Sequence, residues 1–369
     1  MAHHEHEPGV AGPHVAVVHH PGKADRRRLE PLLREAEAAH GWAPARWYPT
    51  AAHDGGAEAA AAAAAGGPAV VLVAGGDGTV RVTATALRGT GIPVALAPSG
   101  TGNLLARNLG LPLADLRSSV ATAFAGVDRA VDLAVARLER EDGGRTTHRF
   151  VVMAGIGLDA SMAANTDAAL KRRIGWAAYV DPIARSILGD AQLFLHYRID
   201  GGRARSVRAH TVIVGNCGTL TAGLLLMPRA EVDDGLLDVA LFRPRSAAAW
   251  ARIGSRLSLG GPLRTTRAGR WLLRVVPAPG GLHFAQARRF DVRFRTGQTI
   301  QLDGDDFGAV VAARLTVEPG ALIVRMPADG ARLPREPRRG GARERRDRTR
   351  LARRGRGYPG DPPRARSQP

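Results

Sequence analysis

The feature that most constrains the fold is a valine-rich run that leads directly into a glycine-rich turn, AVVLVAGGDGT. Its apolar part, residues 69–74, is short and carries no charge, which is typical of a strand buried on both faces of a parallel sheet. The turn at residues 75–79 follows directly, and a helix is expected over residues 80–88. Residues 92–97 form a second apolar run, which ends in another glycine-rich turn, PSGTGN. This order of strands, turns and helix predicts an α/β domain.

The segments before these turns continue the alternation of strands and helices. Residues 14–18 have the pattern of a short buried strand, and residues 45–48 that of a second strand. Between them, residues 24–40 place leucines on one helical face. An alanine-rich helix at residues 56–65 ends at Gly-Gly-Pro, as helices commonly do. We therefore predict a parallel sheet with flanking helices in the N-terminal part.

The pattern changes after about Asp132. Short stretches that alternate or run apolar are separated by turns such as Asp234-Gly235, which predicts a mostly antiparallel β-sandwich. Two helices are expected in this part, near residues 160–190 and 246–260. The expected strands are VDLAVARL, RFVVMAG, LFLHYRI, RAHTVIVGN, LLDVALF, RFDVRF, TIQLDGD and ALIVRM.

Composition divides the chain into three predicted segments: a nucleotide-binding domain at residues 14–134, a β-sandwich at 135–328 and a disordered tail at 329–369. Residues 331–369 hold 14 arginines and 4 acidic residues, so they carry +10 of the net charge of +18. Such a basic, Pro- and Gly-rich segment cannot bury enough apolar surface to fold alone. It can be a solvated extension, a tether to anionic membrane or a nucleic-acid arm. Its one aromatic residue, Tyr358, argues against the last.

The remaining composition limits the class of protein. The single cysteine, Cys217, excludes a disulfide framework and fits a reducing compartment. The N-terminus shows no apolar segment of a secretory signal, and the apolar runs fall short of the ~20 residues that a membrane helix needs. We expect a cytoplasmic protein whose membrane contact is peripheral. Its oligomeric state is not readable from the sequence, and a homodimer stays open.

The two glycine-rich turns are candidates for one phosphate-binding site. Ligands of an open α/β sheet bind at the carboxyl ends of its strands. Glycine lets the backbone approach a phosphate, successive N–H groups form anion nests, and a following helix N-terminus adds positive potential. Each turn alone could be only a tight connection, but two at consecutive strand ends favour a nucleotide held between them.

Other nucleotide motifs fit less well. A P-loop needs Gly-Lys-Ser/Thr, and the two lysines of the chain, Lys23 and Lys171, lack that context. Residues 155–160, GIGLDA, match the loose dinucleotide pattern G-x-G-x-x-A. No parallel strand clearly returns after them, so NAD binding there is a weak alternative.

The motifs AGGDGTV at 74–80 and PSGTGNLLARNLGLP at 98–112 resemble the nucleotide loops of the diacylglycerol kinase family. The resemblance continues through Val131-Asp132-Leu133, GIGLDA, VDDGLLDV at 232–239 and LDGD at 302–305, and covers roughly residues 14–326. It implies an α/β nucleotide domain, a C-terminal β-sandwich and a lipid kinase that uses ATP and Mg²⁺. Diacylglycerol is the acceptor by default.

The resemblance also implies roles for particular residues. His20 stands where the family usually has an asparagine before proline. Asp305 stands where the general base, normally glutamate in a DGE triplet, is found, and Asp132 matches an acidic residue that orients the catalytic network. Magnesium is expected at Asp77 and at a structural site made by Asp234 with backbone carbonyls of Glu231 and Leu236. The nucleotide-binding residues are expected to be His20, Lys23, Thr50, Gly75, Gly76, Asp77, Gly78, Thr79, Gly100, Thr101 and Asn103.

The lipid is expected to enter between the domains. Trp176, Tyr179, Ile183 and Ile187 give one apolar helical face near this entrance, although ordinary core packing explains them as well. The alternative function is a catalytically weak nucleotide-binding regulator, or a nucleic-acid binder that uses the tail.

Overall fold

The computed structural model describes residues 12–157, 192–220, 225–244, 246–264 and 280–328. All of them belong to one structural unit, residues 1–331. The helix expected near residues 160–190 and the arginine-rich tail lie outside the described residues.

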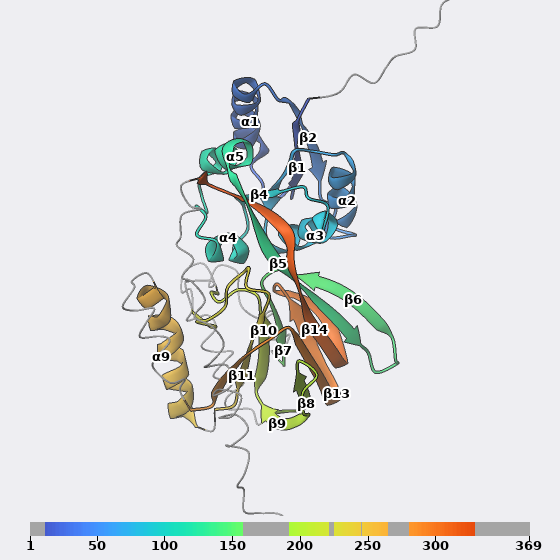
Figure 1. Ribbon diagram of the computed structural model, residues 1–369, viewed down its shortest axis with the longest axis vertical. Coiled ribbons are helices and arrows are strands. Elements are labelled where there is room, and N and C mark those ends of the chain that lie inside the picture. Colours follow the sequence, from blue (N-terminus) through green and yellow to red (C-terminus); the bar gives the residue numbers. More distant parts are fainter. Residues whose placement is uncertain (1–11, 158–191, 221–224, 245, 265–279, 329–369) are drawn as a thin grey trace, which may run out of the picture. The chain divides into compact units, whose positions relative to one another are not determined.

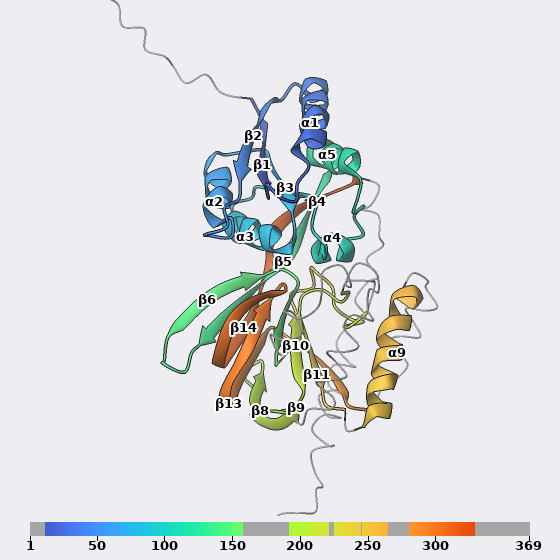
Figure 2. The ribbon, with the colours of Figure 1, turned by 180° about the vertical axis from the view of Figure 1, so that it is seen from behind.

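Four parallel strands form the N-terminal part in the order β2-β1-β3-β4. Every residue of β1 and β3 is buried, as the valine-rich runs predicted. Helices α1 and α5 cover one face of these strands, and α2 and α3 cover the other (Figures 1 and 2). The bounds are β1 His14–His19, α1 Arg26–His40, β2 Ala43–Pro49, α2 Ala57–Ala65, β3 Val70–Gly75, α3 Asp77–Leu87, β4 Val94–Pro98, α4 Leu104–Asn108 and α5 Leu116–Ala125.

Antiparallel strands form the C-terminal part, which confirms the predicted fold class. Their inward side chains, among them Phe150, Ile156, Leu195 and Phe290, make one core. The bounds are β5 Val127–Glu139, β6 Arg145–Phe150, β7 Met153–Ile156, β8 Leu193–Ile199, β9 Arg205–Ala209, β10 Thr211–Gly215, β11 Leu237–Phe242, α9 Ala247–Arg264, β12 Leu282–Ala287, β13 Arg289–Leu302 and β14 Asp305–Met326.

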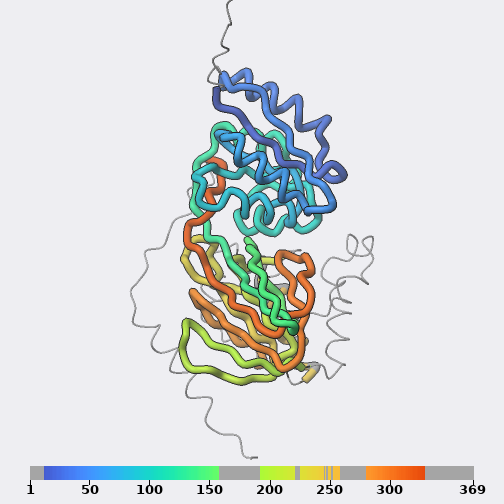
Figure 3. Tube along the Cα trace, turned by 90° about the vertical axis from the view of Figure 1, so that its right-hand side faces the viewer, coloured from blue at the N-terminus to red at the C-terminus, as the bar shows by residue number. Residues whose placement is uncertain are grey.

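Strand β14 belongs to both parts. Along its length it pairs with β13 and β5, and near its end Val324 pairs with Val94 of β4 (Figure 3). Leu322 and Val324 accordingly pack in the core beneath α2 and α3. The last described residues of the chain therefore pair with the N-terminal part. The domain boundaries predicted from the sequence, at residues 134 and 328, stay predictions.

Two stretches expected as single strands are interrupted. RFVVMAG divides into β6 and β7, and RAHTVIVGN divides into β9 and β10. Strand β7 pairs antiparallel with both β10 and β13. The GIGLDA motif therefore does not follow a strand of a parallel βαβ unit, and the NAD alternative is not supported.

Helix α9 confirms the helix expected near residues 246–260. Within the described ranges, none of the helices has the length and apolar character needed to cross a membrane.

Candidate active site

The two glycine turns lie against each other at the carboxyl ends of β3 and β4. The N–H of Ser99 donates to the carbonyl of Gly75 at 3.0 Å. A methyl group on Gly100 would lie only 2.6 Å from the Cα of Gly76. Gly100 therefore has no room for a side chain, and the two turns form one continuous backbone surface.

Asp77, the first residue of α3, ties the turns together. Its Oδ1 accepts the N–H of Leu104 at 2.6 Å, and a side chain on Gly102 would collide with its carboxylate. Burial raises the pKa of Asp77, the N–H groups of Leu104 and Asn103 oppose this rise, and the Asp305 carboxylate adds to it. The contribution of Asp305 indicates that the two carboxylates lie close enough to repel each other.

Asn103 closes the second turn. It adopts a left-handed φ of 48°, its Nδ2 donates to the carbonyl of Gly100 at 2.8 Å, and its Oδ1 accepts the N–H of Gly100 at 3.0 Å. Thr79 is buried against Gly75, where a methyl group would approach the threonine Cβ to 2.6 Å. Thr101 is exposed on the turn. Asn103 and Thr79 thus shape the turns, while Thr101 remains accessible.

The other expected nucleotide residues surround this surface unequally. The Nζ of Lys23 lies 3.7 Å from the position that a Cβ on Gly76 would take, so its charge sits at the first turn. His20 uses its Nδ1 to accept the N–H of Gly22 at 3.1 Å. Thr50 packs against Gly56 at the start of α2, so the structure connects it with α2 rather than with the turns.

Asp305 reaches the first turn from β14. Asp303 and Gly304 have φ of 50° and 91° between the paired residues Leu302 and Asp305, as in a tight two-residue hairpin. The Oδ2 of Asp305 lies 2.5 Å from Nη2 of Arg81, and a methyl group on Gly78 would lie 3.1 Å from the same oxygen. The predicted base therefore lies over the first turn of α3.

Asp306 is oriented differently from Asp305. Its Oδ1 accepts the N–H of Gly308 at 2.7 Å. Successive side chains of an extended strand point to opposite faces, so Asp306 is the natural control for Asp305.

Asp303 anchors the hairpin that carries Asp305. Its buried carboxylate accepts the N–H groups of Val151, Val152 and Met153 at 2.8 to 3.0 Å. Burial outweighs these donors and raises the pKa of Asp303 to about 6. Val151 and Val152 separate β6 from β7, and Met153 begins β7. Asp303 therefore satisfies backbone N–H groups at the interruption between the two strands.

Asp132 belongs to a second cluster. Its carboxylate accepts the N–H of Gly235 at 2.6 Å and that of Gly320 at 2.8 Å, and burial raises its pKa. Gly320 lies in a bulge of β14. Asn216 is buried beside it and donates to the Asp132 carbonyl at 2.8 Å. Asp132 thus holds the bulge and the turn that contains Asp234.

The turn carries the residues expected at a structural cation site, and the Oδ1 of Asp234 accepts the N–H of Leu236 at 3.0 Å. Glu231 is exposed, and Asp234 and Leu236 are half-buried. Burial raises the pKa of Asp238 to about 7, opposed by its hydrogen bond from Gln286 and assisted by the carboxylates of Asp234 and Glu231. Concentrated oxygen donors and negative charge are what Mg²⁺ and Ca²⁺ prefer.

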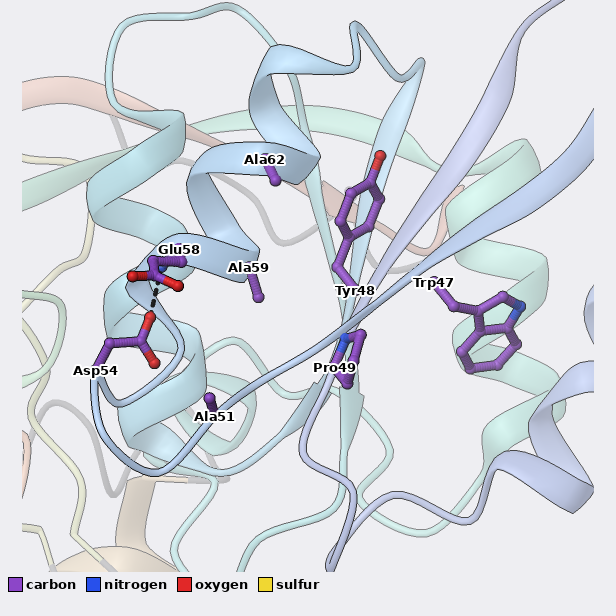
Figure 4. A pocket seen from close by; sticks show the side chains of 8 residues that line it. All are labelled: Trp47, Tyr48, Pro49, Ala51, Asp54, Glu58, Ala59 and Ala62. Carbon is purple, nitrogen blue, oxygen red and sulfur yellow. Dashed lines mark hydrogen bonds between the residues drawn. The ribbon is translucent and has the colours of Figure 1, made fainter.

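A cavity of about 260 Å³ lies between β2 and the start of α2 (Figure 4). No residue of the two glycine turns lines it. Within the described part of the chain, His53, Asp54 and Glu58 are also clustered there as potential metal ligands. Asp54 already accepts the N–H groups of Gly56 and Glu58, so it holds the start of α2. This cavity is separate from the candidate site.

Sequence reasoning missed three residues of this region. Arg81 lies on α3 after the first glycine turn. Its spacing of three residues from Gly78 places both on one face of the helix, and this spacing could have indicated it. Asp303 precedes glycine in the LDGD motif, an Asp-Gly hairpin signal. Asn216 directly follows the buried strand β10, and its Oδ1 has no hydrogen-bond partner among the described residues.

Two family models match the chain in succession. Residues 15–136 match the "Diacylglycerol kinase catalytic domain", and residues 151–326 match the "YegS C-terminal NAD kinase beta sandwich-like domain". Both models describe domains of one family of lipid kinases, and they follow each other along the chain.

Individual relatives agree with the family models. A "Probable lipid kinase YegS-like" protein of Pseudomonas aeruginosa is 32% identical over 281 residues, covering 73% of this chain and 80% of the relative. A "Diacylglycerol kinase" of Mycobacterium tuberculosis is 27% identical, over 70% and 77% of the two chains. A crystal structure of a diacylglycerol kinase from Bacillus anthracis has a similar fold, with a TM-score of 0.61 at 19% identity over 85% and 96% of the chains. The chain belongs to the diacylglycerol kinase family.

Proposed function

We propose that this protein transfers the γ-phosphoryl group of ATP to the hydroxyl group of a lipid, with diacylglycerol as the default acceptor. The observation that carries the proposal is the position of the Asp305 carboxylate over the first turn of α3, which begins within the glycine-rich segment at residues 75–79. The names of the relatives support a lipid acceptor and, for one of them, diacylglycerol.

The phosphates of ATP bind the backbone surface made by the two turns. Gly76 and Gly100 expose main chain there because neither carries a side chain, and Lys23 adds a positive charge beside Gly76. The N-terminus of α3 adds favourable potential for an anion. Phosphoryl transfer needs this positioning and charge neutralisation more than covalent assistance.

Asp305 accepts the proton of the lipid hydroxyl while the hydroxyl oxygen attacks the γ-phosphorus. The bond to the β–γ bridging oxygen breaks, and ADP leaves. Aspartate is shorter than the usual glutamate by about 1 Å, a misplacement that can cost ~10²-fold in rate. The close approach of Asp305 to Gly78 supports a base that reaches the phosphate site despite its shorter side chain.

Magnesium has two candidate positions in this proposal. Part of the Asp77 carboxylate is bound by the Leu104 N–H, so Asp77 would reach a nucleotide-bound ion with its other oxygen. Asp234, with carbonyls of Glu231 and Leu236, would hold a structural ion. When bound, Mg²⁺ offsets the charge that develops on the transferred group.

Contact with an anionic membrane surface is the second part of the proposal. The arginines of residues 331–369 supply the attraction, at about 1 kcal/mol for each basic residue near such a surface. The contact is peripheral and weakens with salt.

Thin-layer chromatography of the reaction with [γ-³²P]ATP tests the proposal. The purified protein is given Mg²⁺ and detergent-dispersed lipids: diacylglycerol, a sphingoid base, phosphatidylglycerol and a glycolipid. We expect label in a lipid phosphate, most strongly from diacylglycerol. ATP binding without labelled lipid would favour the nucleotide-binding regulator instead.

A further inference from the structure

Arg81 is a cation that connects α3 with the start of β14. It lies three residues after Gly78, so both residues share one face of α3. Its side chain is 15% exposed, and its Nη2 lies 2.5 Å from the Oδ2 of Asp305. The guanidinium stands over the ring of Phe307, 5.0 Å from the ring centroid. These contacts hold a delocalised positive charge beside the predicted base.

The ion pair does not use the full capacity of the guanidinium. Arginine carries five N–H donors in a planar fork, and the Nε of Arg81 is buried without a hydrogen-bond partner among the described residues. A stability role alone explains this arrangement poorly. The Asp305 side chain is 53% exposed, and exposed ion pairs contribute only about 0–1 kcal/mol.

The pair also restrains the base, because the Asp305 oxygen nearest to Gly78 is occupied by Arg81. A carboxylate oxygen that must take a proton from a hydroxyl needs a free lone pair. A new anion beside Gly78 would share the guanidinium with Asp305, which would weaken this restraint while keeping Asp305 in place. The γ-phosphate of ATP is such an anion if the turns bind the nucleotide, and arginine is well suited to phosphate recognition.

We propose that Arg81 binds the γ-phosphate of ATP and, through the same guanidinium, positions Asp305 for proton transfer. This inference rests on the proposed function. The proton passes from the lipid hydroxyl to Asp305, the hydroxyl oxygen bonds to the γ-phosphorus, and the bond to ADP breaks.

The chain offers a matched control for Arg81. Arg88, at the other end of α3, pairs with Glu318 of β14 through two hydrogen bonds, at 2.5 Å and 2.8 Å. Arg81→Gln and Arg88→Gln each remove one arginine–carboxylate pair between the same two elements. Only Arg81→Gln removes a charge beside the glycine turns. Arg81→Lys keeps the charge but loses the planar fork.

The test measures Mg-ATP and Mg-ADP affinity by calorimetry for the wild-type protein and the three variants, with circular dichroism to verify folding. Arg81→Gln should weaken ATP binding tenfold or more and change ADP binding less than twofold, because ADP has no γ-phosphate. The ATP affinity of Arg81→Lys should lie between those of the wild type and Arg81→Gln. The ATP affinity of Arg88→Gln should match that of the wild type. The kcat of Arg81→Gln should fall about 10²-fold, as for other lost transition-state donors.

Equal effects of Arg81→Gln on ATP and ADP, or no effect on either, would overturn the assignment of Arg81 while leaving the proposed kinase intact. Failure of the proposed function gives a different result, in which the wild-type protein itself binds neither nucleotide. That result would overturn both.

Discussion

Replacing Asp303 by asparagine should flatten the pH dependence of folding stability. Burial raises the pKa of this carboxyl from 3.8 to about 6 in the folded protein. The folded state therefore holds the proton more tightly than the unfolded state. The contribution of the protonated Asp303 carboxyl to folding stability is present at low pH and is lost as the pH rises through about 6. Linkage with these two pKa values gives a loss of about 1 kcal/mol between pH 5 and pH 7.

Asparagine suits this position in other respects. It tolerates the positive φ of 50°. Its amide oxygen can still accept the N–H groups of Val152 and Met153, which both donate to one oxygen of Asp303. The Val151 N–H loses its partner, so the variant should be less stable overall.

Urea unfolding of both proteins at pH 5, 6 and 7 measures this effect. The unfolding free energy of the wild type minus that of Asp303→Asn should shrink by about 1 kcal/mol from pH 5 to pH 7. A difference that stays constant across this range would refute the reasoning, because it would show that the buried carboxyl does not change its charge there.

Three further outcomes are expected. Gly76→Val should abolish ATP binding in calorimetry and leave the circular dichroism spectrum unchanged. A Cβ at this position fits, at 3.5 Å from Gly100, but the branched side chain covers the phosphate surface. Unchanged ATP affinity would remove this turn from the site. Deleting residues 331–369 should weaken binding to anionic vesicles and preserve turnover on detergent-dispersed lipid, whereas equal wild-type binding to neutral and anionic vesicles would exclude the tether. Mg²⁺ should raise the Tm of the wild type but not that of Asp234→Asn, and an equal rise in both would argue against this metal site.

Much of the fold could be predicted because local patterns decide it. The valine-rich runs of β1 and β3 are buried on both faces, so they show no alternation and identify a parallel sheet. Helix α5 was missed, although Asp115 caps it by accepting the Ser118 N–H, because its few large apolar residues give little periodicity. The pairing of β14 with strands of both the N-terminal and the C-terminal part could not be predicted, because strand pairing is a contact between residues distant in the sequence.

Only part of the candidate site follows from local sequence patterns. Spacing and resemblance indicated the glycine turns and Asp305, because these depend on glycine and turn chemistry along the chain. The partners that hold them come from distant segments. Asp303 meets Val151 and Arg81 meets Asp305 only after folding, so no local pattern reports these contacts.

Asp305 is proposed to activate a lipid hydroxyl toward ATP bound at the glycine turns. The most direct measurement compares the kcat of Asp305→Asn and Asp306→Asn at saturating ATP with the best lipid acceptor. Asp305→Asn should lower kcat by about 10²-fold or more with ATP affinity close to that of the wild type. Asp306→Asn should change kcat little, because Asp306 bonds its own turn. A wild-type kcat for Asp305→Asn would contradict the account and place the base elsewhere.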